Sequence, residues 1–345
     1  MVNIIHHRCA RIPEAMKPQL RVLLLAKHAK GDGSLHQHDG NHATYHHELR
    51  TTLEEIGLNV RAEGNFEALD QALPVNFVIP LLNRAGFQNS EMLAPLMLTR
   101  RQMPFLGASP IIRGLADDKD LSKLVARHCR VETAGWSVYR RGAGVIREPS
   151  WRSDLMVVKP NASSASWGVR IIADWAETRA HVEALHAQGH DVIVEAFCPD
   201  MDMAVPVVGG TGEDPWLLPP MAYAPEEPGS LRTYEEKRAL VPTGLDPLVP
   251  VDDERLVERL QQHTRLLAGH LWPFDYGRFE FRYDPATDAL SFMEVNLSCN
   301  LWSKKTISRS AATLGIDHAT LVESIVAHSL ARQGVLNAEL MEMSA

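Results

Sequence analysis

Two short apolar stretches near the end of the chain each carry a pair of polar residues two positions apart. Arg278 and Glu280 stand in GRFEF, and Glu294 and Asn296 stand in MEVN. Because side chains alternate along a β-strand, each pair points to one face of its strand. The segment between them, YDPATDAL, is rich in turn-forming residues, which predicts that the two strands pair as antiparallel neighbours. Four polar groups would then meet on one face of an otherwise apolar sheet.

A face of this kind is costly unless its polar groups have partners. Two carboxylates and an amide oxygen make a hard oxygen site suited to Mg²⁺, which usually also takes waters and substrate phosphates. A pair of surface strands with alternating polar positions is the alternative, and it is the better interpretation of either pair alone. Both pairs joined by one turn favour a metal site at Glu280, Glu294 and Asn296.

The composition limits what kind of protein can surround such a site. A chain of 345 residues is too long for one ordinary core, so two or three domains are expected. The formal net charge of −8 argues against nucleic acid as a partner. The four cysteines form no C-x-x-C pair, which is typical of reduced thiols in a cytoplasm. Without a run of 18 apolar residues or the apolar core of a signal peptide, we expect a cytoplasmic protein that does not enter a membrane.

Alternating patterns predict an open α/β layer in the first part of the chain. Three apolar runs indicate strands, at residues 20–28, 75–82 and 103–109. Two stretches between them indicate helices, at 41–60, where Gly57 ends the helix, and at 90–101, where Pro95 interrupts it. Further on, helices are predicted from 115, at 176–189 and at 317–332, and strands around 154–172 and at 191–197. No G-x-x-x-x-G-K-[ST] or G-x-G-x-x-G motif supports a P-loop or a dinucleotide site.

Five motifs in this order resemble those of the ATP-grasp superfamily, and within it the D-alanine–D-alanine ligase-like family. They are PFLGAS with DDKDLSK, VVKP with SWGV, VIVEAFCPDMDMAV, YEEKRAL, and GRFEF with MEVN, spread over residues 77–325. Each motif alone is weak, and it is their shared order and spacing that makes the resemblance specific. It implies a three-domain α/β ATP-grasp fold with an N-terminal open α/β domain at 1–115, a central α+β domain at 116–205 and a C-terminal α+β domain at 206–345. ATP would bind between the last two.

The resemblance also implies a role for each residue that matches a motif. The ATP contacts that it implies are Lys119, Lys159, Lys237, Ser164, Ser166, Glu195, Ala196, Cys198 and Asp202. Lys237 is implied to lie on a mobile loop that closes over the γ-phosphate during catalysis. Glu280, Glu294 and Asn296 match the magnesium ligands, with Mn²⁺ as a substitute metal. Arg278 matches the arginine that stabilises the developing oxyanion when an acyl phosphate is attacked.

The substrate positions depart from the family pattern. The family has a glutamate after the first strand, a serine in the phosphate loop and a tyrosine after the third lysine. Here these positions hold His38 (or Asp39, one residue on), Ala165 and Arg238. The Pro-Gly after the metal-binding asparagine is absent, and Lys305-Thr306 replaces a Ser-Leu that holds the second substrate's carboxylate. The resulting expectation for substrate binding is His38, Arg238, Arg278 and Lys305.

These departures bear on the product. The residues implied for ATP are kept and those implied for the amino acids are changed, which argues against D-alanyl-D-alanine. Arg238 and Lys305, with Lys304 beside it, favour anions. We therefore expect at least one substrate to carry a second acidic group or to be larger than alanine. The alternative is that Arg238 points to solvent.

The expected activity is that of an ATP-dependent carboxylate–amine ligase, acting on small amino-acid-like molecules. ATP would phosphorylate a carboxylate, and an amine would attack the resulting acyl phosphate to form an amide or dipeptide bond. The alternatives are a carboxylate kinase, an ester- or thioester-forming enzyme, and a non-catalytic nucleotide-binding regulator. Retention of both carboxylates and all three lysines argues against the regulator. No residue is singled out as the general base, and a homodimer is left open.

Six histidines lie between positions 28 and 47. His42 and His46 are four apart on a predicted helix, a spacing that can bind zinc. A polar loop and helix face without a ligand is the simpler interpretation. A substrate-facing role for His36 or His38 is the third.

Overall fold

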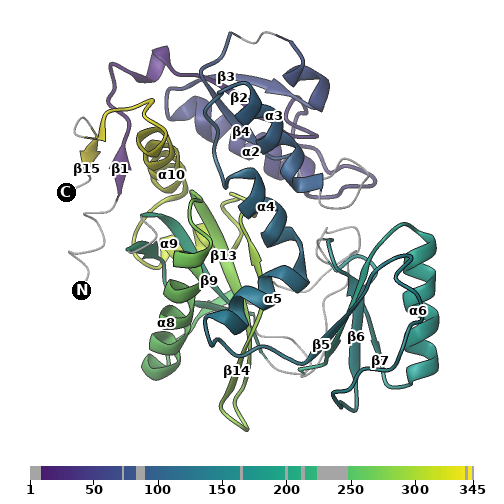
Figure 1. The fold of residues 1–345 in the computed structure, drawn as a ribbon. Coiled ribbons are helices and arrows are strands. Elements are labelled where there is room, and N and C mark those ends of the chain that lie inside the picture. The colour runs from purple at the N-terminus through teal and green to yellow at the C-terminus, as the bar shows by residue number, and fades with distance from the viewer. Residues whose placement is uncertain are drawn as a thin grey trace.

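The computed structural model describes residues 9–71, 74–82, 90–163, 166–198, 201–210, 214–223, 248–338 and 341–343. Within these residues the strands form a three-stranded, a four-stranded and a six-stranded sheet, and a two-stranded ribbon. Figure 1 shows the three larger sheets as separate layers joined by helices. No helix in this part of the chain is both long enough and apolar enough to cross a membrane.

The N-terminal layer is a parallel sheet of three strands in the order β3-β2-β4, formed by β2 (Arg21–Leu25), β3 (Asn59–Glu63) and β4 (Phe77–Pro80). Its central strand, β2, is apolar on both faces because both faces are covered. Leu23 and Leu25 pack against α3 (Leu93–Arg100), and Val22 and Leu24 pack on the side of α2 (His42–Glu55). A continuous apolar run is the pattern expected of such a strand.

Three expectations for this layer are corrected. The stretch 41–60 is not helical throughout. Helix α2 ends at Glu55, next to the predicted stop at Gly57, whose φ of +98° suits a chain reversal, and residues 59–63 form β3, which was not predicted. Pro95 does not interrupt a helix, because α3 begins at Leu93 and the proline sits in its first turn, where no N–H is needed. The strand predicted at 103–109 is reduced to a single bridge between Val78 and Phe105.

The middle layer is an antiparallel sheet in the order β5-β8-β6-β7. Its strands are β5 (Trp136–Tyr139), β6 (Met156–Pro160), β7 (Arg170–Ile172) and β8 (Val192–Ala196). Helix α6 (Trp175–Ala187), capped by Asp174, covers one face through Val182 and Leu185. The opposite face is the one that the site uses.

The largest sheet has the order β12-β11-β9-β13-β14, with β10 paired to β9. Its antiparallel strands are β9 (Met201–Gly210), β10 (Pro215–Leu217), β11 (Met221–Tyr223), β12 (Leu248–Pro250), β13 (Tyr276–Asp284) and β14 (Ala289–Asn296). Arg278 lies opposite Asn296, and Glu280 lies opposite Glu294, which confirms the predicted pairing of these two strands. Phe279 points to the other face, which is apolar.

The apolar face of this sheet is covered by helices from two distant parts of the chain. One is α8 (Glu254–His270), and the others are α4 (Pro110–Asp117) and α5 (Lys119–His128). Ala116 and Ala126 share one cluster with Phe279 and Phe292, so α4 and α5 belong to this core although they precede the middle layer in sequence. The domain boundaries at 115 and 205 stay predictions.

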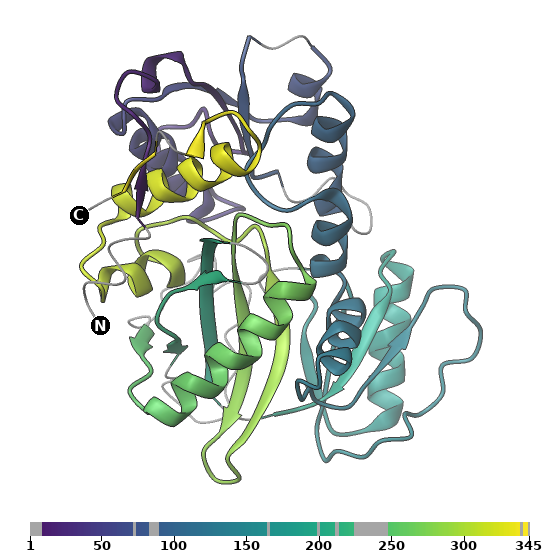
Figure 2. The ribbon, with the colours of Figure 1, turned by 60° about the vertical axis from the view of Figure 1, so that its left-hand side comes forward.

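The two ends of the described chain meet. β1 (Ala10–Arg11) pairs with β15 (Glu342–Met343), and α10 (His318–Arg332), which follows α9 (Thr306–Ala312), packs against β1 and α2. Figure 2 shows α10 lying between the N-terminal layer and the six-stranded sheet. The last helix therefore completes the core begun by the first residues.

One buried carboxylate joins these parts. Asp275, just before β13, accepts hydrogen bonds from the backbone N–H of Gly107 (2.7 Å) and the hydroxyl of Ser329 (2.6 Å). It also pairs with Arg332 through Nε (2.7 Å) and Nη2 (3.0 Å). A single side chain thus ties the end of the N-terminal layer and α10 to the start of the strand that carries the site.

We expect Asp275→Ala to lower the free energy of unfolding by about 3–5 kcal/mol, because it leaves a guanidinium and a buried N–H without their acceptor. Urea denaturation followed by circular dichroism measures this. The matched control is Glu183→Ala, which removes an exposed i,i+4 pair with Arg179 on α6 and should cost less than about 1 kcal/mol. Equal effects of the two variants would contradict the role assigned to Asp275.

Candidate active site

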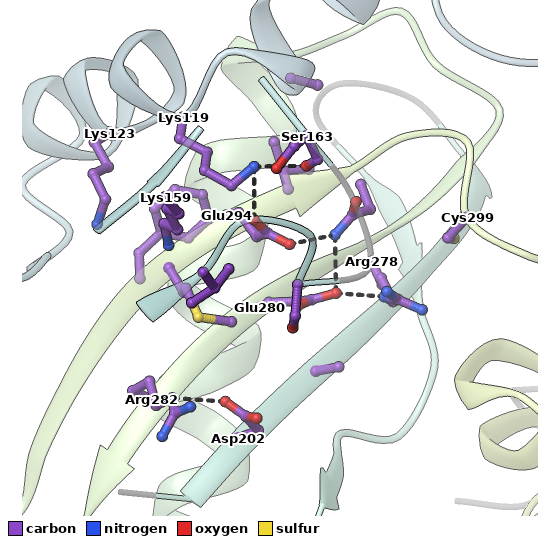
Figure 3. Close-up of a pocket in the computed structure, with 18 of the residues that line it drawn as sticks. Lys119, Lys123, Lys159, Ser163, Asp202, Arg278, Glu280, Arg282, Glu294 and Cys299 are labelled. Atoms are coloured by element: carbon purple, nitrogen blue, oxygen red, sulfur yellow. Dashed lines mark hydrogen bonds and ion pairs between the residues drawn. The ribbon is translucent and has the colours of Figure 1, made fainter. Parts of the chain in front are cut away.

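A cavity of about 310 Å³ lies between the middle sheet and the six-stranded sheet. Strands β6 and β8 form one wall, β9, β13 and β14 form the other, and α5 closes one end (Figure 3). Twelve of the residues singled out from the sequence line it: Lys119, Lys159, Ser166, Glu195, Ala196, Cys198, Asp202, Arg278, Glu280, Glu294, Asn296 and Lys305. Residues spread over nearly two hundred positions are therefore brought to one place.

The paired strands place their polar groups in contact. Asn296 donates through Nδ2 to Glu280 Oε1 (2.9 Å) and to Glu294 Oε1 (3.2 Å). Arg278 Nε donates to the same oxygen of Glu280 (2.5 Å), and Lys119 Nζ lies 3.4 Å from Glu294 Oε2. Figure 3 shows this chain of contacts running from Lys119 across both carboxylates to Arg278. The carboxylates of Glu280 and Glu294 can lie side by side because the amide of Asn296 donates to both and each has a cation of its own, Arg278 and Lys119 respectively.

Burial and charge act against each other at Arg278. Burial alone would lower the pKa of its guanidinium, but the neighbouring groups, with Glu280 foremost, more than offset this and the pKa is raised. Arg278 therefore stays cationic inside the cavity. A positive charge that does not titrate is available at the point where β13 and β14 meet.

A second charged group lies deeper in the cavity. Glu195 on β8 is buried and bridges two lysines, with Lys123 Nζ 2.8 Å from Oε1 and Lys159 Nζ against Oε2. Burial would raise the pKa of Glu195, yet the two ammonium groups hold it at about 2. Burial lowers the pKa of Lys123, whereas for Lys159 the nearby carboxylates outweigh burial and the pKa is raised. Glu195, together with the charge of Glu294, thus keeps Lys159 cationic, and Glu195 holds it in place.

Lys119 owes its position to the start of α5. Asp118 caps this helix by accepting from the N–H of Leu121 (3.1 Å), which turns the next side chain into the cavity. Lys119 Nζ donates to the carbonyl of Ser163 (2.9 Å), at the start of the small-residue loop that follows β6. Ser166 in that loop lines the cavity with a φ of +60°. Ser164, another predicted contact, lies outside the described residues.

Several cavity residues were missed in the sequence, and Arg282 is one of them. Its Nε lies 2.6 Å from Asp202 Oδ1, and its Nη1 donates to the carbonyl of Cys198 (3.0 Å). Arg282 therefore joins two residues that were predicted separately. The signal was present, because Arg282 continues the every-second-residue pattern of Arg278 and Glu280. Lys123 likewise lies four positions after Lys119, on the same face of α5.

The other end of the cavity is less well predicted. His42, at the start of α2, lines it, whereas His38 is exposed on the preceding loop and is not among the described residues that line it. Glu91 and Tyr223 also line it, and neither belongs to a recognisable motif. Tyr223 places its hydroxyl 2.5 Å from Thr306 Oγ1. Lys237 and Arg238 fall in a part of the chain that the structure does not describe.

The histidine cluster has an internal set of partners. His28 Nε2 lies 2.8 Å from Asp39 Oδ2, and Lys27 Nζ lies 2.5 Å from the same oxygen. Burial would raise the pKa of Asp39, but Lys27 and the hydrogen bond with His28 hold it at about 2. His28, His36 and Asp39 have potential ligand atoms within 4.8 Å of one another, but Lys27 already occupies the carboxylate. His46, one of the two histidines whose spacing can bind zinc, accepts from the backbone N–H of His28 through Nδ1.

Comparisons with known proteins identify the family. A family model described as D-ala D-ala ligase C-terminus matches residues 150–327. The D-alanine–D-alanine ligase of Desulfovibrio desulfuricans is 30% identical over 259 residues, which cover 73% of this chain and 79% of that protein.

Solved structures share the fold. A D-alanine–D-alanine ligase from Bacillus anthracis complexed with ATP has a TM-score of 0.71 at 17% identity, covering 92% of this chain and 99% of that one. The VanG D-Ala:D-Ser ligase from Enterococcus faecalis has a TM-score of 0.67 at 12% identity, covering 90% and 99%. The chain therefore belongs to the D-alanine–D-alanine ligase family of ATP-grasp enzymes, ATP-binding ligases that form C–N bonds.

Proposed function

We propose that this enzyme activates a small carboxylic acid as its acyl phosphate and transfers the acyl group to an amino acid in the cavity between β6–β8 and β13–β14. The carboxylate oxygen attacks the γ-phosphorus of ATP and ADP leaves. The amine nitrogen then attacks the acyl carbon, phosphate leaves, and the nitrogen loses a proton. The observation that carries this proposal is the meeting of Lys119, Lys159 and Arg278 with Glu280 and Glu294 in one cavity.

The carboxylates fit a hard divalent cation. Glu280 and Glu294 both direct an oxygen at the amide of Asn296, and half a turn of that amide would present a third oxygen in the same space. Three oxygen donors, with room left for phosphate oxygens, are the usual protein share of a Mg²⁺ site. Mg²⁺, when bound, neutralises the phosphate oxygens and polarises the phosphorus that is attacked.

The cationic side chains have separate tasks. Lys119 and Lys159 bind the phosphates, and Glu195 keeps the ammonium of Lys159 from turning away. Arg278 stabilises the oxyanion that develops when the amine attacks the acyl carbon. Asp202 binds the ribose, and Arg282 orients Asp202 through their ion pair. Arg282 also fixes the carbonyl of Cys198, at the end of the segment Glu195–Cys198 that is proposed to contact adenine. Lys237 and Ser164 keep their proposed roles as further phosphate contacts.

The nature of the two substrates is inferred from the residues at the end of the cavity that His42, Glu91 and Lys305 line. The relatives named above are D-alanine–D-alanine ligases and one D-Ala:D-Ser ligase, so the comparisons do not support the expectation of a different product. One observation still favours a product other than D-alanyl-D-alanine. Lys305 lines the cavity together with His42 and Glu91, which gives this end one ammonium and one further carboxylate. We assign the acceptor's carboxylate to Lys305, and we retain a donor or acceptor larger or more acidic than alanine as the finer proposal.

Glu294→Gln should reduce turnover by at least about 100-fold while the protein stays folded, because one of the two negative metal ligands becomes neutral. ADP release measures turnover, and the melting temperature reports the fold. The control is Glu177→Gln, which makes the same chemical change in the first turn of α6, away from the cavity. Wild-type ADP release by Glu294→Gln would remove the metal site from the proposal.

ATP with Mg²⁺ should raise the melting temperature, because a ligand that binds only the native state stabilises it by mass action. Lys159→Ala should weaken ATP binding by about 10- to 100-fold, the usual loss for a charged hydrogen bond, and shrink this shift accordingly. Lys30→Ala is the control, since Lys30 is exposed and pairs with Glu63 on β3. An undiminished shift in Lys159→Ala would contradict the phosphate role of Lys159.

A pairwise screen tests the substrates. ADP release is measured with D-alanine, neutral amino acids and dicarboxylic amino acids as donor and acceptor, and with hydroxylamine in place of the acceptor. Hydroxylamine traps any acyl phosphate as a hydroxamate, so it reports the first half-reaction even when the acceptor is wrong. We expect a pair other than D-alanine with D-alanine to be preferred. If D-alanine serves best on both sides, the finer proposal is wrong and the ligase activity stands.

A further inference from the structure

The segment that follows β14 supplies much of the substrate end of the cavity. Ser298, Cys299, Asn300 and Lys305 of this post-β14 loop (residues 297–305) line the cavity. The loop starts tightly packed, because a Cβ on Gly277 would lie 2.7 Å from Leu297 Cδ2 and 2.9 Å from the carbonyl oxygen of Asn296. Its remaining course is set by contacts from the N-terminal half of the chain.

These contacts come from α2 and α4. Arg113 on α4 donates through Nη1 to the carbonyl of Leu297 (3.1 Å), and Tyr45 on α2 accepts from the backbone N–H of Leu301 (3.3 Å). A third residue that contacts the loop is Glu48 on α2, which is not among the described residues that line the cavity. Helix α4 therefore holds the loop at its beginning, and α2 of the N-terminal layer holds it at its middle.

Glu48 makes two contacts to the loop at once. Its Oε2 accepts from the indole Nε1–H of Trp302 (2.9 Å), and its Oε1 accepts from the backbone N–H of Ser303 (2.8 Å). His318 Nε2 lies 3.6 Å from the same oxygen Oε1. Each of the two donors has its own oxygen, and an amide would keep an acceptor for one of them and place an NH₂ group against the other.

The ring that Glu48 holds is next to Lys305. Trp302 is largely buried, and the ammonium groups of Lys304 and Lys305 lie 5.8 and 5.9 Å from its ring centroid. A cation at this distance is attracted to the ring face. The backbone N–H of Lys305 also donates to the carbonyl of Trp302 (2.9 Å), closing the turn that leads into α9. The orientation of the indole thus sets where the ammonium of Lys305 enters the cavity.

We propose that Glu48 is a positioning residue for the acceptor substrate: by holding Trp302 and Ser303 it fixes the ammonium of Lys305 against the acceptor's carboxylate. This inference rests on the proposed function, in which Lys305 binds the acceptor. It gives the N-terminal helix α2 a part in substrate selection through the loop and not through contact with the substrate. Glu48 is not among the described residues that line the cavity, so we expect its loss to leave ATP binding unchanged.

The test is Glu48→Gln, which keeps the size of the side chain but puts an NH₂ group against either the indole N–H or the N–H of Ser303. The probes are ATP, the amino-acid pair that gives most ADP in the screen above, and hydroxylamine in place of the acceptor. KM for the acceptor should rise about tenfold, the cost of leaving one donor unmet. KM for ATP and the rate of hydroxamate formation should stay at the wild-type values.

A second variant separates positioning from a general structural defect. Trp302→Phe removes the indole N–H, so in the double variant with Glu48→Gln the amide oxygen can accept from Ser303 while its NH₂ meets no donor. The acceptor KM of the double variant should therefore lie well below the product of the two single effects. Glu54→Gln, at an exposed site on the same helix, is the matched control and should change none of these values.

Three outcomes would overturn the inference. Glu48→Gln could leave the acceptor KM unchanged, or raise the ATP KM and slow hydroxamate formation to the same degree. The double variant could also show simple multiplication of the two effects. If instead the wild-type protein forms neither amide nor hydroxamate with any pair, the proposed function itself fails, and this inference with it.

Discussion

The pairing of β13 with β14 in one register is the constraint on which the rest of the structure depends. It sets Glu280 opposite Glu294 on the cavity face and turns Phe279 into the core beneath. A slip of one residue would reverse both, because strand side chains alternate, and would bury the carboxylates against α8. The stability of the sheet and the chemistry of the site therefore select the same alignment. A bulge after Glu280 adjusts the strands next to the site, as bulges commonly do.

The cavity is close to self-neutralised before any ligand enters. Five of its cations form ion pairs with carboxylates: Lys119 with Glu294, Arg278 with Glu280, Arg282 with Asp202, and both Lys123 and Lys159 with Glu195. A polyphosphate that takes Lys119 must leave Glu294 without its cation, unless another positive charge replaces it. In the proposed function, a divalent metal at the carboxylates would supply that charge. The ion pairs would then favour the joint entry of nucleotide and metal over the entry of either alone.

Local patterns were sufficient where a site residue lies in a strand or helix with regular alternation. GRFEF and MEVN predicted both the pairing and the face. Lys123 was missed, although its spacing of four from Lys119 places it on the same face of α5. Patterns fail where the site is closed by packing between layers. His42 and Glu91 reach the cavity because the N-terminal layer docks there, and nothing in their neighbourhood signals it. β3 was missed for a related reason: NVRAE is a partly exposed edge strand, so it lacks the apolar run that identified β2.

The meeting of the two chain ends has a consequence for biosynthesis. One face of β2 packs on neighbours no later than Phe105, so Leu23 and Leu25 find their partners soon after they leave the ribosome. The other face packs on the side of α2, and the same cluster also holds Leu321, Ile325 and Leu330 of α10, which are made about three hundred residues later. Because α10 packs against α2 and β1, the core begun by the first residues is completed only at the end of translation. Until α10 emerges, a nascent chain would display the apolar side of α2 that α10 covers, the kind of surface that chaperones bind.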